Sequence, residues 1–287
     1  MLHEASLILE GGGMRGVYTG GVLEYFMEQD LYFRKNYGVS AGACQGMSYL
    51  SRQAGRNKKV TIDLINDKRY MKLSGIIDGT GLFNKDFVFD EIPNHLVKFD
   101  FEAFTKGPEE MYAVVTDCKT GEADYINLKD ITKHQDILTV LLASCSLPLI
   151  APSVDYNGEV YMDGGLADSI PIRHAYQNGF NRHVLILTRE RTYRKDITDK
   201  KQRVIRKVYK KYPRLIEAIE RRDVNYNQSR DIIDVLEAEG LVYPIYPKEP
   251  LIVSRTDRDQ KKLELAYQMG YEDGRYHHDR LIDFLEG

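Results

Sequence analysis

Short apolar runs and helix-like spacings alternate along the first fifty residues of the chain. Residues 6–9 form an apolar run that ends in three glycines, and residues 17–27 then place apolar and small side chains at helical spacing. A second apolar stretch covers residues 31–39 and leads into a small-residue helical pattern that begins at Ala41. The order strand, helix, strand, helix is typical of a parallel α/β sheet.

Two antiparallel hairpins are predicted further along the chain. One turns at Lys119-Thr120-Gly121, and the other turns at Asn157-Gly158, a dipeptide that favours tight two-residue turns. The strands around these turns are residues 111–118, 122–128, 154–156 and 159–161. Residues 183–188 have the apolar composition of a buried core strand.

Residues 137–154 contain no charged side chain, and their length satisfies the minimum for a membrane-spanning helix. Pro148 and Pro152 would interrupt that helix. The remaining segment, residues 137–147, would be about 16 Å long, which is too short to cross a hydrocarbon layer of ~30 Å. We therefore predict a buried helix and turn here.

The composition changes near residue 190. Residues 191–222 carry thirteen Lys or Arg and four Asp or Glu, and their apolar positions have the spacing of an amphipathic helix, with a kink expected at Pro213. Helices are also predicted over residues 224–239 and 260–284, with a strand-like segment at residues 241–246 between them. The predicted organisation is a catalytic core at residues 1–190 and a mostly helical C-terminal extension, residues 191–287, packed on it.

Charge and cysteine content indicate which partners and which cellular location to expect. The formal net charge of -3 hides a local balance of +9 in residues 191–222 and -12 elsewhere. We expect a peripheral contact between this basic stretch and anionic lipid, although a solvated helix face would look the same. With three cysteines and no N-terminal signal pattern, a cytoplasmic location is expected, with peripheral contact at the inner face of the membrane. No recognition motif for nucleic acid accompanies the basic residues, so we expect no nucleic acid to bind.

The glycine-rich hexapeptide at residues 11–16 fits G-x-G-x-x-G between a predicted strand and helix. Its backbone N–H groups can point at an anion, which could be a dinucleotide pyrophosphate or the oxyanion of an ester intermediate. The dinucleotide interpretation requires an acidic residue at the end of the second strand. Asp30 lies before that strand, and Ser40 stands at its end. A packing turn without a ligand is the third interpretation.

Ser40 lies in Gly38-Val39-Ser40-Ala41-Gly42, a G-x-S-x-G sequence at a predicted strand-to-helix junction. In that context the motif places a serine on a strained turn with its hydroxyl exposed, and small neighbours allow the chain to turn. We therefore predict that Ser40 is a nucleophile.

A serine hydroxyl needs a positioned base, and Asp163 follows the second hairpin in the sequence Asp163-Gly164-Gly165. The alternative is a plain Asp-Gly turn. His174 and His183 would give the chain order of a Ser-Asp-His triad, but both have the setting of structural or surface residues.

Four segments together resemble the patatin-like phospholipases: residues 11–16 (GGGMRG), 38–42 (GVSAG), 143–148 (ASCSLP) and 163–165 (DGG). They occur in the family's order and at its spacing, and they span residues 5 to about 175. The resemblance implies a three-layer α/β/α fold with a mainly parallel central sheet and a C-terminal helical appendage.

The resemblance also implies a serine lipid acyl hydrolase of the phospholipase A or esterase type, acting on a lipid ester or phospholipid. Ser40 would be the nucleophile of a Ser-Asp dyad and Asp163 its general base, with residues 143–148 as support. The oxyanion would be held by backbone N–H groups of Gly12, Gly13 and Met14, with Arg15 alongside. The motif glycines are Gly11, Gly16, Gly38, Gly42, Gly164 and Gly165.

Other functions stay open at this point. A catalytically weak storage or interaction protein with the same fold would carry the same motifs, and an esterase with a Ser-Asp-His triad is a further alternative. The dyad chemistry needs no metal ion or other cofactor, and none is expected. The sequence does not indicate an oligomeric state.

Overall fold

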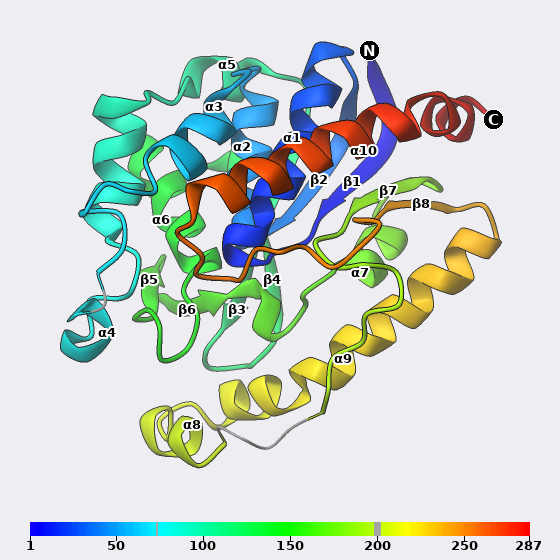
Figure 1. The fold of residues 1–287 in the computed structure, drawn as a ribbon. Helices are drawn as coiled ribbons and strands as arrows, with labels where there is room; N and C mark the ends of the chain where they lie inside the picture. The colour runs from blue at the N-terminus through cyan, green and yellow to red at the C-terminus, as the bar shows by residue number, and fades with distance from the viewer. Residues whose placement is uncertain (73, 198–201) are drawn as a thin grey trace.

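The computed structural model describes residues 1–72, 74–197 and 202–287, so residues 198–201 of the basic stretch lie outside the described residues. A single mixed sheet of eight strands runs through the centre (Figure 1). The strands are β1 (Leu2–Leu9), β2 (Tyr32–Val39), β3 (Glu110–Asp117), β4 (Ala123–Asn127), β5 (Val154–Tyr156), β6 (Glu159–Asp163), β7 (His183–Ile186) and β8 (Val242–Ile245).

The sheet is parallel on one side and antiparallel on the other. Its order is β5-β6-β3-β2-β1-β7-β8, with β4 paired to β3. Strands β3, β2, β1, β7 and β8 are mutually parallel, whereas β4 and β6 run antiparallel to β3 and β5 runs antiparallel to β6. Both predicted hairpins are present, and Asn157 and Gly158 have the positive φ angles (50° and 84°) that such a tight turn requires.

Helices cover both faces of the sheet. They are α1 (Gly16–Glu28), α2 (Ala41–Leu50), α3 (Arg56–Lys58), α4 (Ser74–Asp78), α5 (Phe101–Lys106), α6 (His134–Ser144), α7 (Ile172–Gln177), α8 (Gln202–Val208), α9 (Pro213–Ala238) and α10 (Gln260–Glu286). Two π-helical segments, Lys59–Asp63 and Phe87–Leu96, lie between α3 and α5.

Alternate residues of the central strands enter different cores, as the pleat of a strand requires. Leu7 and Leu9 of β1 pack in the core that contains α1, α2, α6 and α10. Ile8 packs in a second core with α7 and α9, on the opposite face. This alternation confirms the predicted α/β/α layers.

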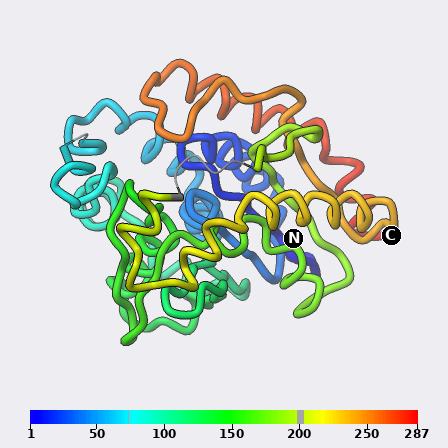
Figure 2. Tube along the Cα trace, turned by 90° about the horizontal axis from the view of Figure 1, so that it is seen from below, coloured from blue at the N-terminus to red at the C-terminus, as the bar shows by residue number. Residues whose placement is uncertain are grey.

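The C-terminal segment adds a strand to the same sheet and a helix to each of its faces. Strand β8 extends the sheet beside β7, α10 packs along α1, and α9 packs against α7 and β8. Figure 2 shows the molecule from below, where α9 crosses this end of the structure. An added Cβ at Gly21 of α1 would overlap the Tyr267 carbonyl oxygen of α10, so the two helices pack at backbone contact.

The expected kinked helix over the basic stretch is wrong. Residues Arg191–Ile197 are irregular, α8 ends at Val208, and α9 starts at Pro213 instead of bending there. Proline at the first position of a helix lacks an N–H that would have no partner anyway, so it favours a helix start. The separate helix predicted from residue 224 belongs to the same continuous α9. Among the described residues, no helix is both long and apolar enough to span a membrane.

Candidate active site

Ser40 lies directly after β2 and before α2, at the carboxyl end of the parallel strands. Its backbone has φ 54° and ψ -123°, a strained conformation for a residue with a side chain. Its N–H donates to the Ser144 hydroxyl oxygen at 2.9 Å, and that hydroxyl donates to the Val114 carbonyl at 2.7 Å. The end of α6 therefore holds the turn from behind, as expected for the segment at residues 143–148.

The glycines beside Ser40 permit close backbone packing. An added Cβ at Gly42 would overlap the Leu9 carbonyl oxygen, and one at Gly38 would overlap the backbone of Ala43. Because any larger residue would push α2 away from the sheet, these two positions fix how Ser40 is presented.

Asp163 ends β6 and faces the same polar pocket as Ser40. Its N–H donates to the Ser146 carbonyl at 2.9 Å, and its own carbonyl accepts from the Thr116 hydroxyl at 2.9 Å. Its carboxylate accepts from the Gly165 N–H at 2.8 Å. Gly164 lies against the Val114 backbone, where a Cβ would overlap the carbonyl oxygen. Backbone and side-chain contacts thus fix the Asp163 carboxylate.

Burial raises the pKa of Asp163. The nearby Arg222 guanidinium, the Ser40 hydroxyl acting as a hydrogen-bond donor and the Gly165 N–H all oppose that rise in pKa. A carboxylate with a raised pKa accepts a proton more readily at neutral pH, which is what a general base requires.

The glycine-rich turn lies beside the serine. An added Cβ at Gly11 would come within 3.1 Å of the Ser40 Cβ, and one at Gly16 would come within 2.8 Å of the Ala41 Cβ. Gly13 has a φ of 59°, which favours glycine. In the described part of the chain, the N–H groups of Gly12 and Gly13 donate to no protein acceptor.

The other two residues predicted at the oxyanion have different positions. The Met14 N–H donates to the Arg255 carbonyl at 3.0 Å, so it is already used within the protein. Arg15 is buried, at 6% exposure, and lines the polar pocket together with Ser40 and Asp163.

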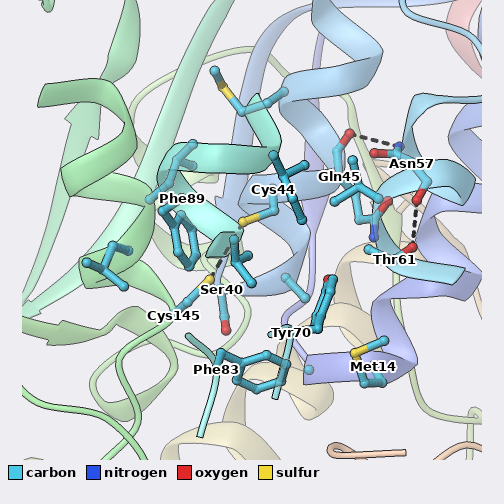
Figure 3. Close-up of a pocket in the computed structure, with 18 of the residues that line it drawn as sticks. Met14, Ser40, Cys44, Gln45, Asn57, Thr61, Tyr70, Phe83, Phe89 and Cys145 are labelled. Carbon is cyan, nitrogen blue, oxygen red and sulfur yellow. Dashed lines mark hydrogen bonds between the residues drawn. The ribbon is translucent and has the colours of Figure 1, made fainter. Parts of the chain in front are cut away.

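An apolar cavity of about 180 Å³ opens on one side of Ser40. Figure 3 shows Ser40 among Tyr70, Phe83, Phe89 and Cys145. Much of the wall comes from the π-helical segment Phe87–Leu96 and from α6, which supply Val88, Ile92, Leu138 and Leu141. Such a wall suits an alkyl chain. No helix or strand is predicted from the sequence between residues 51 and 110, so the sequence did not indicate this part of the site.

A smaller polar pocket of about 40 Å³ opens on the other side of Ser40. Ser40 and Arg255 line both spaces. The polar pocket contains five basic side chains, Arg15, Arg189, Lys195, Arg222 and Arg255. Only Arg15 lies in one of the sequence motifs. Lys195 and Arg222 lie in the basic stretch, residues 191–222, whereas Arg189 and Arg255 lie outside it, so the basic content of that stretch could indicate only two of these residues.

The histidines of the triad alternative lie elsewhere. His183 starts β7, at the far end of the strand from the site, and its Nδ1 is 2.6 Å from the Ser6 hydroxyl oxygen. His174 stacks on Tyr125, with ring centroids 3.5 Å apart. Within the described residues, neither histidine lines the spaces beside Ser40, and no cluster of His, Cys, Asp and Glu suits a metal ion.

Asp30, the acidic residue of the dinucleotide interpretation, lies at an exposed turn and pairs with the N-terminal amine of Met1 at 2.6 Å. It is not part of the pocket that contains the glycine-rich turn. Asp30 therefore cannot serve as the ribose-binding carboxylate that the dinucleotide interpretation requires.

Comparison with known proteins agrees with this geometry. The chain is 26% identical over 282 residues to the uncharacterized protein YjjU of Escherichia coli (strain K12), covering 94% of this chain and 76% of that protein. It is 26% identical over 216 residues to the probable lipid hydrolase 463L of Invertebrate iridescent virus 6, covering 67% and 72%. The crystal structure of VipD from Legionella pneumophila has a similar fold, with a TM-score of 0.54 and 14% identity over 99% of this chain and 67% of that one.

Two family models match separate parts of the chain. Residues 212–286 match a domain of unknown function (DUF6363). Residues 7–176, which contain the glycine-rich turn, Ser40 and Asp163, match the patatin-like phospholipase model. Since the second match covers more than half of the chain, this protein belongs to the patatin-like phospholipase family.

Proposed function

We propose that this protein is a serine lipid acyl hydrolase that cleaves carboxylic esters with Ser40 and Asp163. The observation that carries the proposal is the placement of a strained serine beside a buried carboxylate, between a glycine turn with free N–H groups and an apolar cavity. Membership of a family of lipid hydrolases supports the same reaction.

The first half of the reaction forms an acyl-enzyme. Asp163 accepts the proton of the Ser40 hydroxyl while the serine oxygen attacks the ester carbonyl carbon. The carbonyl oxygen becomes an oxyanion, and the N–H groups of Gly12 and Gly13 donate to it. Each such donor lowers the barrier by about 2.7–4 kcal/mol in another hydrolase. The ester C–O bond then breaks, and the alcohol leaves with the proton from Asp163.

The second half returns the enzyme to its starting state. Asp163 accepts a proton from water, and the resulting hydroxide attacks the acyl carbon. The bond to the Ser40 oxygen breaks, Asp163 returns the proton to that oxygen, and the carboxylic acid is released. The apolar cavity holds the acyl chain through both steps, because its aromatic and aliphatic wall removes alkyl surface from water.

The decisive experiment measures hydrolysis by the purified protein on a panel from short nitrophenyl esters to phospholipids and lysophospholipids. Ser40→Ala and Asp163→Asn should each remove ester turnover. Asp168→Asn is the matched control, because this nearby, partly buried carboxylate accepts from the Tyr125 hydroxyl at 2.7 Å and lies outside the pocket. Substantial turnover by the serine variant, or none by the unaltered protein, would contradict the proposal.

We also propose that the protein meets anionic lipid through α8. Several basic residues of the predicted contact, residues 191–222, are used otherwise: Arg191 and Arg194 pair with acids of α9, and Arg222 faces the polar pocket. On α8, Val204 and Val208 are 53% and 55% exposed, one helical turn apart. Apolar and basic side chains on one short helix suit a lipid interface.

Co-sedimentation with vesicles tests this contact. Binding to anionic vesicles should exceed binding to neutral ones and should weaken with salt. Val208→Asp should reduce this binding. Val235→Asp is the matched control, because Val235 is similarly exposed at 57% but lies on α9, and it should leave the binding unchanged. Equal reduction by the two variants, or binding that does not depend on salt, would exclude α8 as the contact.

A further inference from the structure

The polar pocket beside Ser40 has an excess of positive charge. Two acidic side chains, Glu10 and Asp163, line it together with the five basic ones. Glu10 is already engaged, since its carboxylate accepts from the Thr188 N–H at 2.6 Å and from the Thr188 hydroxyl at 3.1 Å. Asp163 is the general base of the proposed reaction. The pocket therefore contains more cations than its own acids balance.

Most of these cations have no carboxylate partner. In the part of the chain that the structure describes, Arg15, Arg189, Arg222 and Arg255 form no ion pair within 4.0 Å, and Lys195 lies 3.7 Å from Asp223. Arg15 is the clearest case: its side chain is buried and its Nε has no hydrogen-bond partner. A buried guanidinium N–H without an acceptor is costly, so a ligand that supplies the acceptor is expected at this position.

The cations also act on one another. Burial and the neighbouring Arg189 and Arg255 lower the pKa of Arg15 to about 10. Burial, together with Arg222 and Arg255, lowers the pKa of Lys195 to about 7, and Asp223 opposes this shift. Repulsion among like charges in a partly desolvated pocket would be relieved by one bound anion.

The pocket is held in place by backbone contacts. Arg222 Nε donates to the Gly165 carbonyl at 2.6 Å, next to the general base. The Arg255 carbonyl accepts from the Met14 N–H, which fixes this segment over the glycine turn. Because the cations come from distant segments that meet only here, the cluster is a built feature of the site. Burial of Arg15 also excludes it from a flat membrane surface.

We propose that this pocket binds the phosphate group of an anionic lipid ester, on the alcohol side of the bond that Ser40 cleaves. The inference rests on the proposed hydrolase function. With the acyl chain in the apolar cavity, the ester carbonyl lies at Ser40 and the alcohol portion enters the polar pocket, whose lining includes Arg15, Arg189 and Arg222. Planar guanidinium groups match phosphate oxygens in pairs, and a phosphomonoester carries the double charge that this excess of cations favours.

The test compares two esters with the same acyl chain. Oleoyl lysophosphatidic acid carries a phosphomonoester, and monooleoylglycerol carries a hydroxyl in its place. We expect kcat/KM to be about tenfold or more higher for the phosphate ester, as charge-assisted hydrogen bonds would provide. Inorganic phosphate should compete with lysophosphatidic acid in the unaltered protein, a measurement that requires no variant.

A charge variant and a matched control locate the effect. Arg189→Gln should lower the ratio of the two kcat/KM values by about tenfold. Arg191→Gln should leave the ratio unchanged, because Arg191 comes from the same segment but pairs with Glu237 outside the pocket.

Three outcomes overturn the proposal or its basis. Hydrolysis of both esters at equal kcat/KM would refute the phosphate subsite and leave the hydrolase function standing. Competition by inorganic phosphate without a preference for the phosphate ester would assign the pocket to a free anion. No turnover of any ester, short nitrophenyl esters included, would refute the hydrolase function itself.

Discussion

Replacing Ser144 by alanine should lower the stability of the protein at the Ser40 turn, although Ser144 itself lines neither pocket. The Ser144 hydroxyl accepts from the Ser40 N–H at 2.9 Å and donates to the Val114 carbonyl at 2.7 Å. It therefore links the nucleophile turn to β3 inside a fully buried region. Ser144→Ala removes this link and leaves the Ser40 N–H without its acceptor.

The cost can be estimated from that lost acceptor. A buried donor left unpaired costs about 1–3 kcal/mol of unfolding free energy. Ser146→Ala is the matched control, because Ser146 is equally buried but its hydroxyl donates only to the Leu142 carbonyl of the neighbouring α6, at 2.8 Å. That carbonyl lies in α6, where helical hydrogen bonds already use such groups, so the control should cost less than about 1 kcal/mol.

Urea denaturation of the three proteins measures both free energies, and ester turnover provides a second readout. We expect Ser144→Ala to lose more stability than Ser146→Ala and to have a lower kcat/KM, because its Ser40 turn is less firmly held. Equal losses of stability in the two variants would refute the reasoning, since they would show that the link to Ser40 contributes nothing of its own.

Three further outcomes follow from the same geometry. Ser40→Gly should be more stable than Ser40→Ala by about 1–3 kcal/mol in urea denaturation, because only glycine relieves the φ of 54°, and equal stability would contradict strain at this turn. Because burial raises the pKa of Asp163, the loss of kcat/KM on acidification should begin at a pH above the range in which carboxyl groups ordinarily titrate. A loss of kcat/KM that begins only within that ordinary range would exclude Asp163 as the base. Gly21→Ala should lower the thermal midpoint, since its Cβ would overlap the Tyr267 carbonyl at a cost of about 1–3 kcal/mol, whereas helix propensity alone predicts a gain.

The parts of the site that sequence reasoning found are those encoded in a few adjacent residues. The turn at Ser40 needs small neighbours on both sides, so its position is visible as a local pattern. Asp163 follows a hairpin whose Asn157-Gly158 turn is equally local. Strands such as β1 were recognisable because burial on both faces of a parallel sheet requires a continuous apolar run.

The parts that were missed depend on tertiary contacts. A basic side chain looks the same in the sequence whether it faces solvent, as Arg203 does, or an active site, as Arg222 does. The segment Phe87–Leu96 contains Pro93, a residue that is unfavourable inside an α-helix, and it forms π-helical turns, which no sequence pattern announces. Its apolar residues find their place only when α6 packs against them.

The packing of α10 along α1 has a consequence for the order in which the protein is made and folds. Ser40 is synthesised long before α10, yet α1 acquires its partner only when residues Gln260–Glu286 have been synthesised. The Arg255 carbonyl that covers the glycine turn also arrives late. Contacts of such long range slow folding, and domains that are incomplete during synthesis expose apolar surface. We therefore expect chains that end before Gln260 to lack hydrolase activity, because α1 and the glycine turn would then lack these contacts.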